Sequence, residues 1–345
     1  MKAMVLTGIR KMEMREVPEP VMRSDNDVLI RVKRVGVCGS DVHYYTAGRI
    51  GSQVVQYPYR VGHECSGVVE QVGSAVRNVK PGDRIAVEPA QSCFKCDQCR
   101  MGRVNTCRNL SFLGTPGQGD GCLCEWLVMP SECCFPVPQS LSLDEAALVE
   151  PLSIGVYSVR QSVPMKGAKV GILGVGPIGL SCLIPARQAG AATVYVTDRI
   201  DRRLAAARGA GADWTGNPDT SDIVAGIARA EPGLLDVVFE CCGRQEALDQ
   251  AIDILRPGGT LMLVGIPPVD RVSFSIDQIR RKEITLRNVR RQAHCVQPAI
   301  DLAAGSDVDL GFMLTHRFPF EKSAEAFDLV DQYRDGVIKA MITLD

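Results

Sequence analysis

The chain lacks the features that would direct it to a nucleic acid, a membrane or the secretory route. Its 39 Lys and Arg nearly balance 40 Asp and Glu, and no extended basic run is present to follow a phosphate backbone. Residues 1–14 contain no continuous apolar stretch or small-residue cleavage site of the signal-peptide kind. The longest uncharged run, residues 170–186, holds glycines and prolines and is shorter than the ~18 apolar residues of a spanning helix. We therefore expect a cytoplasmic protein that binds neither nucleic acid nor membrane.

Internal repeats and low-complexity segments are also missing, which leaves a globular chain. Its 345 residues are 46% hydrophobic, enough to bury a large core, and this length favours two domains of roughly 150 residues each. The 14 cysteines come without a secretion signal, so they indicate reduced thiols and metal ligands more than a disulfide framework.

Four of these cysteines are closely spaced in a polar, loop-like stretch: Cys93, Cys96, Cys99 and Cys107. Their gaps are too short for separate structural elements. Two disulfides among such close neighbours would strain the bridge geometry. A tetrahedron of thiolates around Zn²⁺ needs only a tight loop, so we predict a structural zinc that organises this lobe and takes no part in catalysis.

The secondary structure that the sequence predicts changes along the chain. Up to about residue 138, β-branched segments alternate with Gly, Pro and Asp, which is typical of β-rich structure. Strands then alternate with helical stretches, as in βαβ units of a doubly wound parallel sheet, before a mixed tail. We expect an α/β protein in which residues 1–155, rejoined by 290–345, form one domain and residues 156–289 form the other.

A GxGxxG motif follows the first strand of the second domain. Gly174 permits a tight turn, Gly176 lets the backbone approach a pyrophosphate, and Gly179 lets helix pack on strand. The following helix presents its N-terminal N–H groups to the phosphates. Asp198 ends the next strand, where a carboxylate accepts hydrogen bonds from a ribose diol and repels a 2′-phosphate, favouring NAD over NADP.

Three arginines beside Asp198 weaken this preference, because they are candidates either to bind a 2′-phosphate or to form an exposed helix face. They are Arg199, Arg202 and Arg203. The predicted cofactor-binding residues are Gly174, Gly176, Pro177, Ile178, Gly179, Asp198 and Arg203.

A second set of metal-ligand candidates is scattered through the first domain: Cys38, His63, Glu64 and Glu150. Each alone would indicate a core residue, but sulfur, nitrogen and oxygen donors together suit a catalytic zinc, which keeps one coordination position open. Residues 63 and 64 would point to opposite faces of a strand. Both can reach one ion only if the backbone departs from extended geometry there.

In this order, CGSD, GHE, the four-cysteine loop and GxGxxG resemble the zinc-dependent medium-chain alcohol dehydrogenases over nearly the whole chain. Within that superfamily, residues 35–51, 150–160 and 315–330 look like the sorbitol (L-iditol) and xylitol dehydrogenases. The resemblance implies a GroES-like catalytic domain beside a Rossmann domain, and two zinc ions per chain. It makes Cys38, His63 and either Glu64 or Glu150 the catalytic zinc ligands, with the remaining carboxylate close by or acting through water.

The resemblance also implies catalytic roles. Zinc polarises the alcohol while its hydride moves to NAD, and Ser40 resembles the hydroxyl that receives the proton. His43 either completes this relay or has a surface or ribose-contact role. Tyr44 resembles a substrate-pocket residue, and a structural ion pair is the alternative role of Glu150.

One segment departs from the polyol pattern, which has an Arg-Tyr pair near the far hydroxyls of the substrate. Arg291 matches the arginine, but Gln292 replaces the aromatic residue, so we expect a pocket of different shape and polarity. The sequence therefore leaves open which polyol is the substrate. His294 and Cys295 follow as pocket or core residues.

We therefore expect an oxidoreductase that transfers hydride from a secondary hydroxyl of a sugar alcohol to NAD, giving a ketose. Another secondary alcohol, such as a short diol, a cyclitol or threonine, is the closest alternative. A non-catalytic, zinc-stabilised nucleotide-binding protein is the alternative of a different class. Relatives are dimers or tetramers, and the apolar segment 283–289 at a sheet edge could pair with a second copy, so we expect a homo-oligomer.

Overall fold

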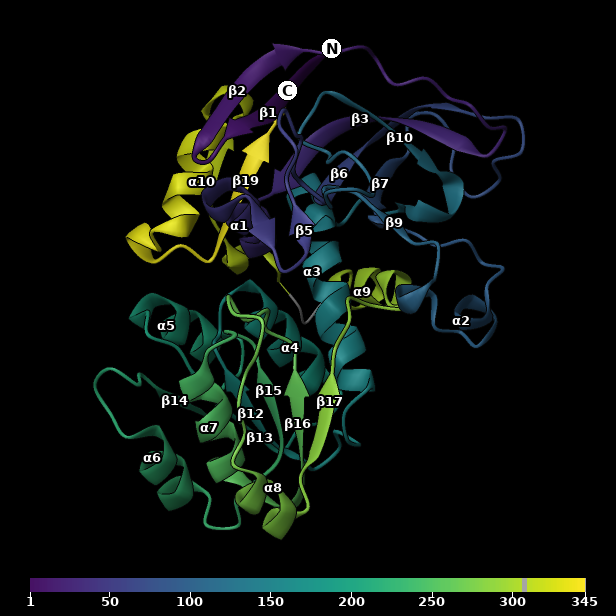
Figure 1. Cartoon of the computed structure of the whole chain (residues 1–345). Helices are drawn as coiled ribbons and strands as arrows, with labels where there is room; N and C mark the ends of the chain where they lie inside the picture. Colours follow the sequence, from purple (N-terminus) through teal and green to yellow (C-terminus); the bar gives the residue numbers. More distant parts are fainter. Residues whose placement is uncertain (306–308, 345) are drawn as a thin grey trace. The chain divides into compact units, whose positions relative to one another are not determined.

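The computed structural model describes residues 1–305 and 309–344, and the chain divides into two compact units (Figure 1). The first unit joins Met1–Glu150 to Val296–Asp345, and the second is Pro151–Cys295. These divisions lie a few residues from the expected ones at 155/156 and 289/290. Among the described residues, no helix combines the length and apolar character needed to span a bilayer.

The first unit is built on a seven-stranded sheet of order β11-β7-β6-β3-β19-β18, in which β10 also pairs with β3. Its sheet strands are β3 (Asp27–Gly36), β6 (Glu64–Val72), β7 (Arg84–Val87), β10 (Trp126–Pro130), β11 (Cys134–Pro136), β18 (Leu314–Pro319) and β19 (Lys339–Thr343). The central strand β3 pairs antiparallel with β6 on one side and with β19 on the other. Strands far apart in the sequence thus meet at β3.

Short strand pairs and helices complete this unit. The paired strands are β1 (Lys2–Gly8), β2 (Lys11–Glu16), β4 (Arg49–Ile50), β5 (Gln53–Val54), β8 (Ala90–Gln91) and β9 (Ser111–Phe112). The helices are α1 (Gly39–Ala47), α2 (Asp97–Arg100), α9 (Val296–Ala303) and α10 (Ser323–Asp331). Helix α1 packs on α10, where the rings of Tyr45 and Phe327 meet edge-on at 5.5 Å. Helix α3 (Leu143–Arg160) starts in this unit and ends in the second.

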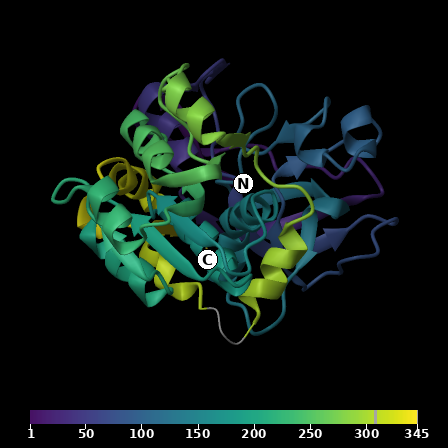
Figure 2. The ribbon, with the colours of Figure 1, turned by 90° about the horizontal axis from the view of Figure 1, so that it is seen from below.

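The second unit contains a six-stranded sheet of order β14-β13-β12-β15-β16-β17, with every neighbouring pair parallel. Its strands are β12 (Lys169–Leu173), β13 (Thr193–Thr197), β14 (Trp214–Gly216), β15 (Leu235–Glu240), β16 (Leu255–Leu263) and β17 (Thr285–Asn288). Its helices are α4 (Pro177–Gln188), α5 (Asp201–Gly209), α6 (Ile223–Ala230), α7 (Gln245–Ile254) and α8 (Ile276–Lys282), which lie beside the strands (Figures 1 and 2). The predicted α/β fold with a doubly wound parallel sheet is confirmed.

One local expectation in this unit is confirmed. Segment 283–289 lies at the sheet edge, because β17 ends the strand order. Helix α7 ends at Ile254. Pairing with β15 draws the chain into β16 from Leu255 onward, so Pro257 and Gly258 lie within that strand.

Candidate zinc and nucleotide sites

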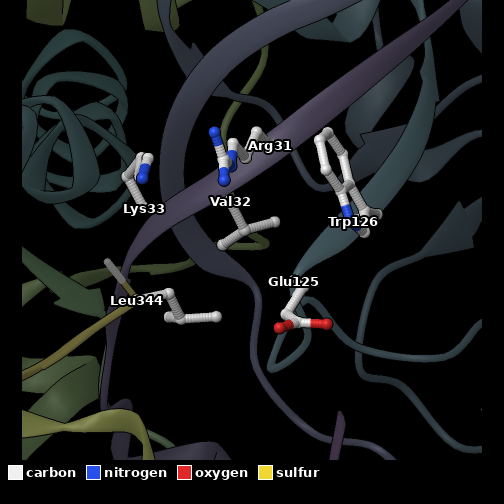
Figure 3. Close-up of a pocket in the computed structure, with 6 residues that line it drawn as sticks. All are labelled: Arg31, Val32, Lys33, Glu125, Trp126 and Leu344. Carbon is white, nitrogen blue, oxygen red and sulfur yellow. The ribbon is translucent and has the colours of Figure 1, made fainter. Parts of the chain in front are cut away.

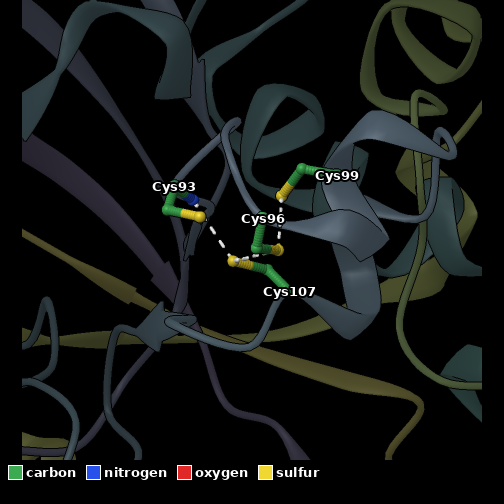
Figure 4. A group of neighbouring side chains, drawn as sticks. All are labelled: Cys93, Cys96, Cys99 and Cys107. Carbon is green, nitrogen blue, oxygen red and sulfur yellow. Dashed lines mark hydrogen bonds between the residues drawn. The ribbon is translucent and has the colours of Figure 1, made fainter.

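The four closely spaced cysteines converge at one point of the first unit (Figure 4). Cys96 Sγ lies 3.5 Å from Cys99 Sγ and 3.9 Å from Cys107 Sγ. These separations suit a ZnS₄ tetrahedron, in which Zn–S bonds of ~2.3 Å place the sulfurs about 3.8 Å apart. The backbone N–H of Lys95 is the main cause that lowers the pKa of Cys93 to about 6, which favours the thiolate that binds metal.

The loop that carries these thiols is closed by an ion pair. Arg108 donates from Nε and Nη2 to the two oxygens of Asp97, at 2.6 and 2.7 Å. The chain's 14 cysteines all lie in the described residues and all are free thiols. The group therefore forms the structural Cys₄ zinc site.

Cys38, His63 and Glu64 form a second cluster, whose ligand atoms lie within 4.8 Å of one another. Cys38 occupies the N-cap position of α1, and Glu64 is the first residue of β6. His63 precedes the strand and follows Gly62, whose φ of +100° takes the backbone out of extended geometry. The bend lies directly before His63 and Glu64, whose ligand atoms converge on one point. Glu150 is not in this group of described residues, so the geometry favours Glu64 as the third zinc ligand.

Asp41 lies beside the imidazole of His63. It is fully buried, its Oδ1 accepts the N–H of Gly62 at 3.2 Å, and its Oδ2 lies 3.2 Å from His63 Nδ1. That second contact is poorly aligned, and Oδ2 has no hydrogen-bond partner in the described residues. Once aligned, a proton on Nδ1 would satisfy Oδ2 and leave the Nε2 lone pair for a metal, so this orphaned oxygen fits a zinc site.

Glu64 also forms an ion pair that the sequence analysis missed. Lys339 Nζ lies 2.7 and 2.6 Å from its two carboxylate oxygens, and both residues are 1% exposed. The same ammonium donates to Val37 O at 3.2 Å. Burial alone would lower the pKa of Lys339, but Glu64, Cys38 and Glu150 together outweigh it and the pKa is raised. Lys339 is the only charged residue in the apolar segment 337–344, which is a signal the sequence did contain.

Glu150 lies on α3 and is buried. Burial raises the pKa of its carboxyl group to about 8, with Glu64 and Glu88 adding to the shift and His63 and Lys339 opposing it. In the absence of metal this carboxyl group thus holds its proton more readily than an exposed one. The preference for Glu64 rests on the geometry of the cluster.

Helix α1 carries the predicted relay and pocket residues. Ser40 Oγ lies 3.3 Å from Cys38 Sγ, beside the metal-ligand cluster. His43 is half-buried, which lowers its pKa and favours the neutral ring, although the Asp331 carboxylate opposes the shift. Tyr44 is buried and donates its hydroxyl to Gln53 Oε1 at 3.0 Å. One helix thus carries all three residues and places Ser40 beside Cys38.

The glycine motif forms a tight turn between β12 and α4. Gly174 has φ +86°, and a Cβ on Gly179 would lie 2.1 Å from the carbonyl oxygen of Gly174. Gly176 is the N-cap of α4 and offers no side-chain cap, while Pro177 and Ile178 form the first turn. The turn fits a dinucleotide, because the N-terminus of α4 has no side-chain cap and the glycines before it allow a close approach.

Asp198 is fixed beside this turn. Its Oδ2 accepts the N–H of Val175 at 2.9 Å and its Oδ1 accepts that of Ile200 at 3.0 Å. The Nη1 of buried Arg203 lies 4.0 Å from Oδ2. Arg199 is turned to Asp219, donating from Nε to both carboxylate oxygens at 2.9 and 2.8 Å. Two of the three arginines thus face carboxylates.

The structure places Arg291 in the second unit, whereas the candidate zinc ligands belong to the first. Gln292 is buried and its Oε1 accepts the N–H of Cys295 at 2.8 Å. Gln292, which replaces the expected aromatic residue, therefore stabilises its own loop. Cys295 is 1% exposed, which favours the core role over the pocket role for this thiol.

A separate small pocket lies on the first unit where β3 meets β10 (Figure 3). It is lined by Arg31, Val32, Lys33, Glu125, Trp126 and Leu344. The guanidinium of Arg31 lies 5.5 Å from the centre of the Trp126 ring. The pocket shares no residue with either thiol cluster or with the glycine turn, so it is not part of the candidate site.

Comparison with known proteins adds to this geometry. Residues 24–139 match the family model of the alcohol dehydrogenase GroES-like domain, and residues 177–305 match that of the zinc-binding dehydrogenases. Sorbitol dehydrogenase of Bacillus subtilis is 36% identical over 99% of this chain and 97% of its own.

Two solved structures have the same fold and bear on substrate and cofactor. A zinc-binding dehydrogenase of Sinorhizobium meliloti, bound to NADP, has a TM-score of 0.90 at 31% identity, covering 99% of each chain. The 2R,3R-butanediol dehydrogenase of Bacillus subtilis has a TM-score of 0.89 at 29% identity, covering 100% of this chain and 99% of its own.

Proposed function

We propose that this chain, which belongs to the zinc-dependent medium-chain alcohol dehydrogenase family, oxidises a secondary hydroxyl of a sugar alcohol to a ketose with NAD as hydride acceptor. The observation that carries the proposal is the convergence of Cys38, His63 and Glu64 beside Ser40. Similarity to a sorbitol dehydrogenase over 99% of the chain supports a polyol as substrate. Similarity to a butanediol dehydrogenase makes a short diol the second candidate.

Each residue of the first unit has a defined task in this proposal. Cys38, His63 and Glu64 hold the metal, and Asp41 keeps His63 in the tautomer that binds it. Bound zinc supplies a Lewis acid that makes the alcohol a stronger acid. Ser40 accepts the proton of the alcohol and passes it toward solvent.

His43 is proposed as the next proton carrier, because it lies on the same helix as Ser40 and because burial lowers its pKa. A neutral imidazole accepts a proton at neutral pH. Tyr44 and Arg291 are proposed as substrate contacts. Arg291 would act through its fork of N–H donors, which suits several hydroxyls.

The second unit favours NAD as the cofactor. Asp198 stands beside the glycine turn and carries the negative charge that repels a 2′-phosphate. Arg199 is paired with Asp219, and Nη1 of Arg203 lies 4.0 Å from the carboxylate of Asp198. Similarity to an NADP-bound dehydrogenase keeps NADP as the second candidate.

The test is a panel of alcohols with NAD⁺ or NADP⁺, read by absorbance of the reduced nucleotide. We expect sorbitol or xylitol to exceed butanediol, a cyclitol and threonine by at least about tenfold in kcat/KM, which is ~1.4 kcal/mol of transition-state binding. A faster reaction with butanediol or threonine would show that the substrate is another secondary alcohol and not a sugar alcohol. Nucleotide binding without turnover of any alcohol would instead indicate a non-catalytic protein.

Zinc content provides the matching structural test. The purified chain should hold two zinc ions, and Cys38→Ser should lose one of them together with all turnover. Cys124→Ser is the control, because Cys124 is a fully buried thiol of the same unit outside both clusters. It should keep both ions and its activity.

A further inference from the structure

We propose that Lys339 is a positioning residue that competes with zinc for the carboxylate of Glu64 and so determines how tightly the Cys38 site holds its metal. The inference rests on the zinc site of the proposed function. It does not depend on which alcohol is oxidised.

The first observation is that Lys339 occupies both oxygens of a metal ligand. Its Nζ lies 2.6 and 2.7 Å from them, and neither side chain has appreciable contact with solvent. A surface lysine would exchange such a partner for water at little cost. Here water is excluded. A carboxylate oxygen of Glu64 that binds a metal must therefore either keep the Lys339 ammonium as a second partner or lose its contact with it.

The second observation is that Glu64 has little freedom to avoid Lys339. A Cβ built on Gly36 would lie 2.2 Å from Glu64 Oε2, so the carboxylate already occupies the space above this glycine. The ammonium is fixed in turn, because it also donates to Val37 O at 3.2 Å. The ion pair is therefore confined from both ends.

The third observation explains how two residues 275 positions apart come to meet. Strand β3 lies between β6, which carries Glu64, and β19, which carries Lys339. Gly36 pairs with Glu64 on one side and with Met341 on the other. The two side chains reach each other across β3 because the residue between them has no side chain.

The effect of Lys339 on zinc binding follows from comparing the metal-free and zinc-loaded states. Without Lys339, the metal-free protein would keep a buried carboxylate that has lost its ion-pair partner, which is strongly destabilising. In the loaded protein, Zn²⁺ itself neutralises Glu64. Removing the ammonium charge therefore harms the metal-free state more than the loaded one, and by thermodynamic linkage zinc binds more tightly.

The experiment starts from zinc-loaded protein, so that no variant has to fold without metal. Excess chelator is added, zinc release is followed, and the release from Cys38→Ser, which retains only the Cys₄ ion, is subtracted. We expect Lys339→Met to slow release from the Cys38 site by at least about tenfold. Lys339→Arg keeps the charge and should release zinc at close to the wild-type rate.

Two controls separate this role from general destabilisation. Lys169→Met removes the Lys169–Glu231 ion pair of the second unit, where the contact is 2.7 Å, and should leave zinc release unchanged. In a Glu64→Gln background, Lys339→Met should have no further effect, because the charge for which Lys339 competes is gone. Should the methionine variant fail to fold, Lys339→Gln replaces it with the same expected result.

Unchanged or faster release in Lys339→Met, with two zinc ions in the wild type, would overturn this inference alone. Equal slowing in the Glu64→Gln background would also overturn it, since Lys339 would then act through some other group. A wild-type chain holding only the Cys₄ zinc would overturn the proposed function itself. The two failures are therefore distinguishable.

Discussion

Replacement of Asp41 by asparagine tests whether His63 is a metal ligand oriented by its buried neighbour. Asparagine has nearly the same shape, and its carbonyl oxygen can still accept the N–H of Gly62, now bonded to Oδ1 at 3.2 Å. Its amide N–H₂ replaces Oδ2, which lies 3.2 Å from His63 Nδ1. A donor at this place favours the tautomer with its proton on Nε2, the nitrogen that the metal needs.

The expected magnitude follows from this change of tautomer. Loss of such a partner to a ligating histidine typically costs 10- to 100-fold in metal affinity, or about 1.4–2.8 kcal/mol. The contact of Oδ2 is poorly aligned, so we expect the lower half of this range for Asp41→Asn. The Cys₄ zinc, which shares no ligand with this site, should be retained.

The assay is chelator competition on the loaded protein, with zinc counted per chain. Asp120→Asn is the matched control, because Asp120 belongs to the same unit but its side chain is 63% exposed and only weakly paired with Arg60 at 3.5 Å. An Asp41→Asn variant whose affinity at the Cys38 site stays within about twofold of the wild type would refute the assigned orientation of His63.

Three further outcomes are expected. Cys107→Ser should release the Cys₄ zinc and lower the melting temperature by several degrees, as measured by calorimetry, because that loop has little core of its own. Asp198→Asn should raise the ratio of NADP to NAD turnover by about tenfold in steady-state assays, since it removes a charge that repels a 2′-phosphate. Asp236→Asn should make stability depend less on pH under acidic conditions. Burial acts to raise the pKa of Asp236, but the N–H of Lys169 at 2.8 Å and Arg256 at 2.6 Å lower it overall. Its stabilisation is thus present above about pH 4 and fades as the pH falls, and melting curves across pH 2–6 should show a smaller loss of stability in the variant than in the wild type.

The features that the sequence predicted well are those whose geometry is set by neighbours along the chain. Four thiols on one short loop can converge without help from a sheet, so spacing alone indicated their site. The glycine turn is equally local, because the φ of Gly174 and the packing of Gly179 depend on a few residues. Alternation of strand and helix likewise predicted the parallel sheet.

The features that sequence left open depend on which distant segments pack together. Glu64 and Glu150 were equal candidates for the third ligand, because one belongs to a strand and the other to a helix more than 80 positions later. The fold separates them by placing Glu64, and not Glu150, among the described residues of the Cys38 cluster. Spacing along the sequence cannot reveal which of the two lies there.

Lys339 shows why such a residue escapes a search for ligand motifs. It binds no metal and belongs to no spacing pattern, so its only sequence signal is a charge inside an apolar strand. A lysine there must find a buried counter-charge, since burying an unpaired ammonium is too costly. The carboxylate that it finds is the one that clusters with Cys38 and His63. A lone charge within an apolar strand therefore indicates a partner of opposite charge in the core, and in a metal protein the ligands are the first place to look for it.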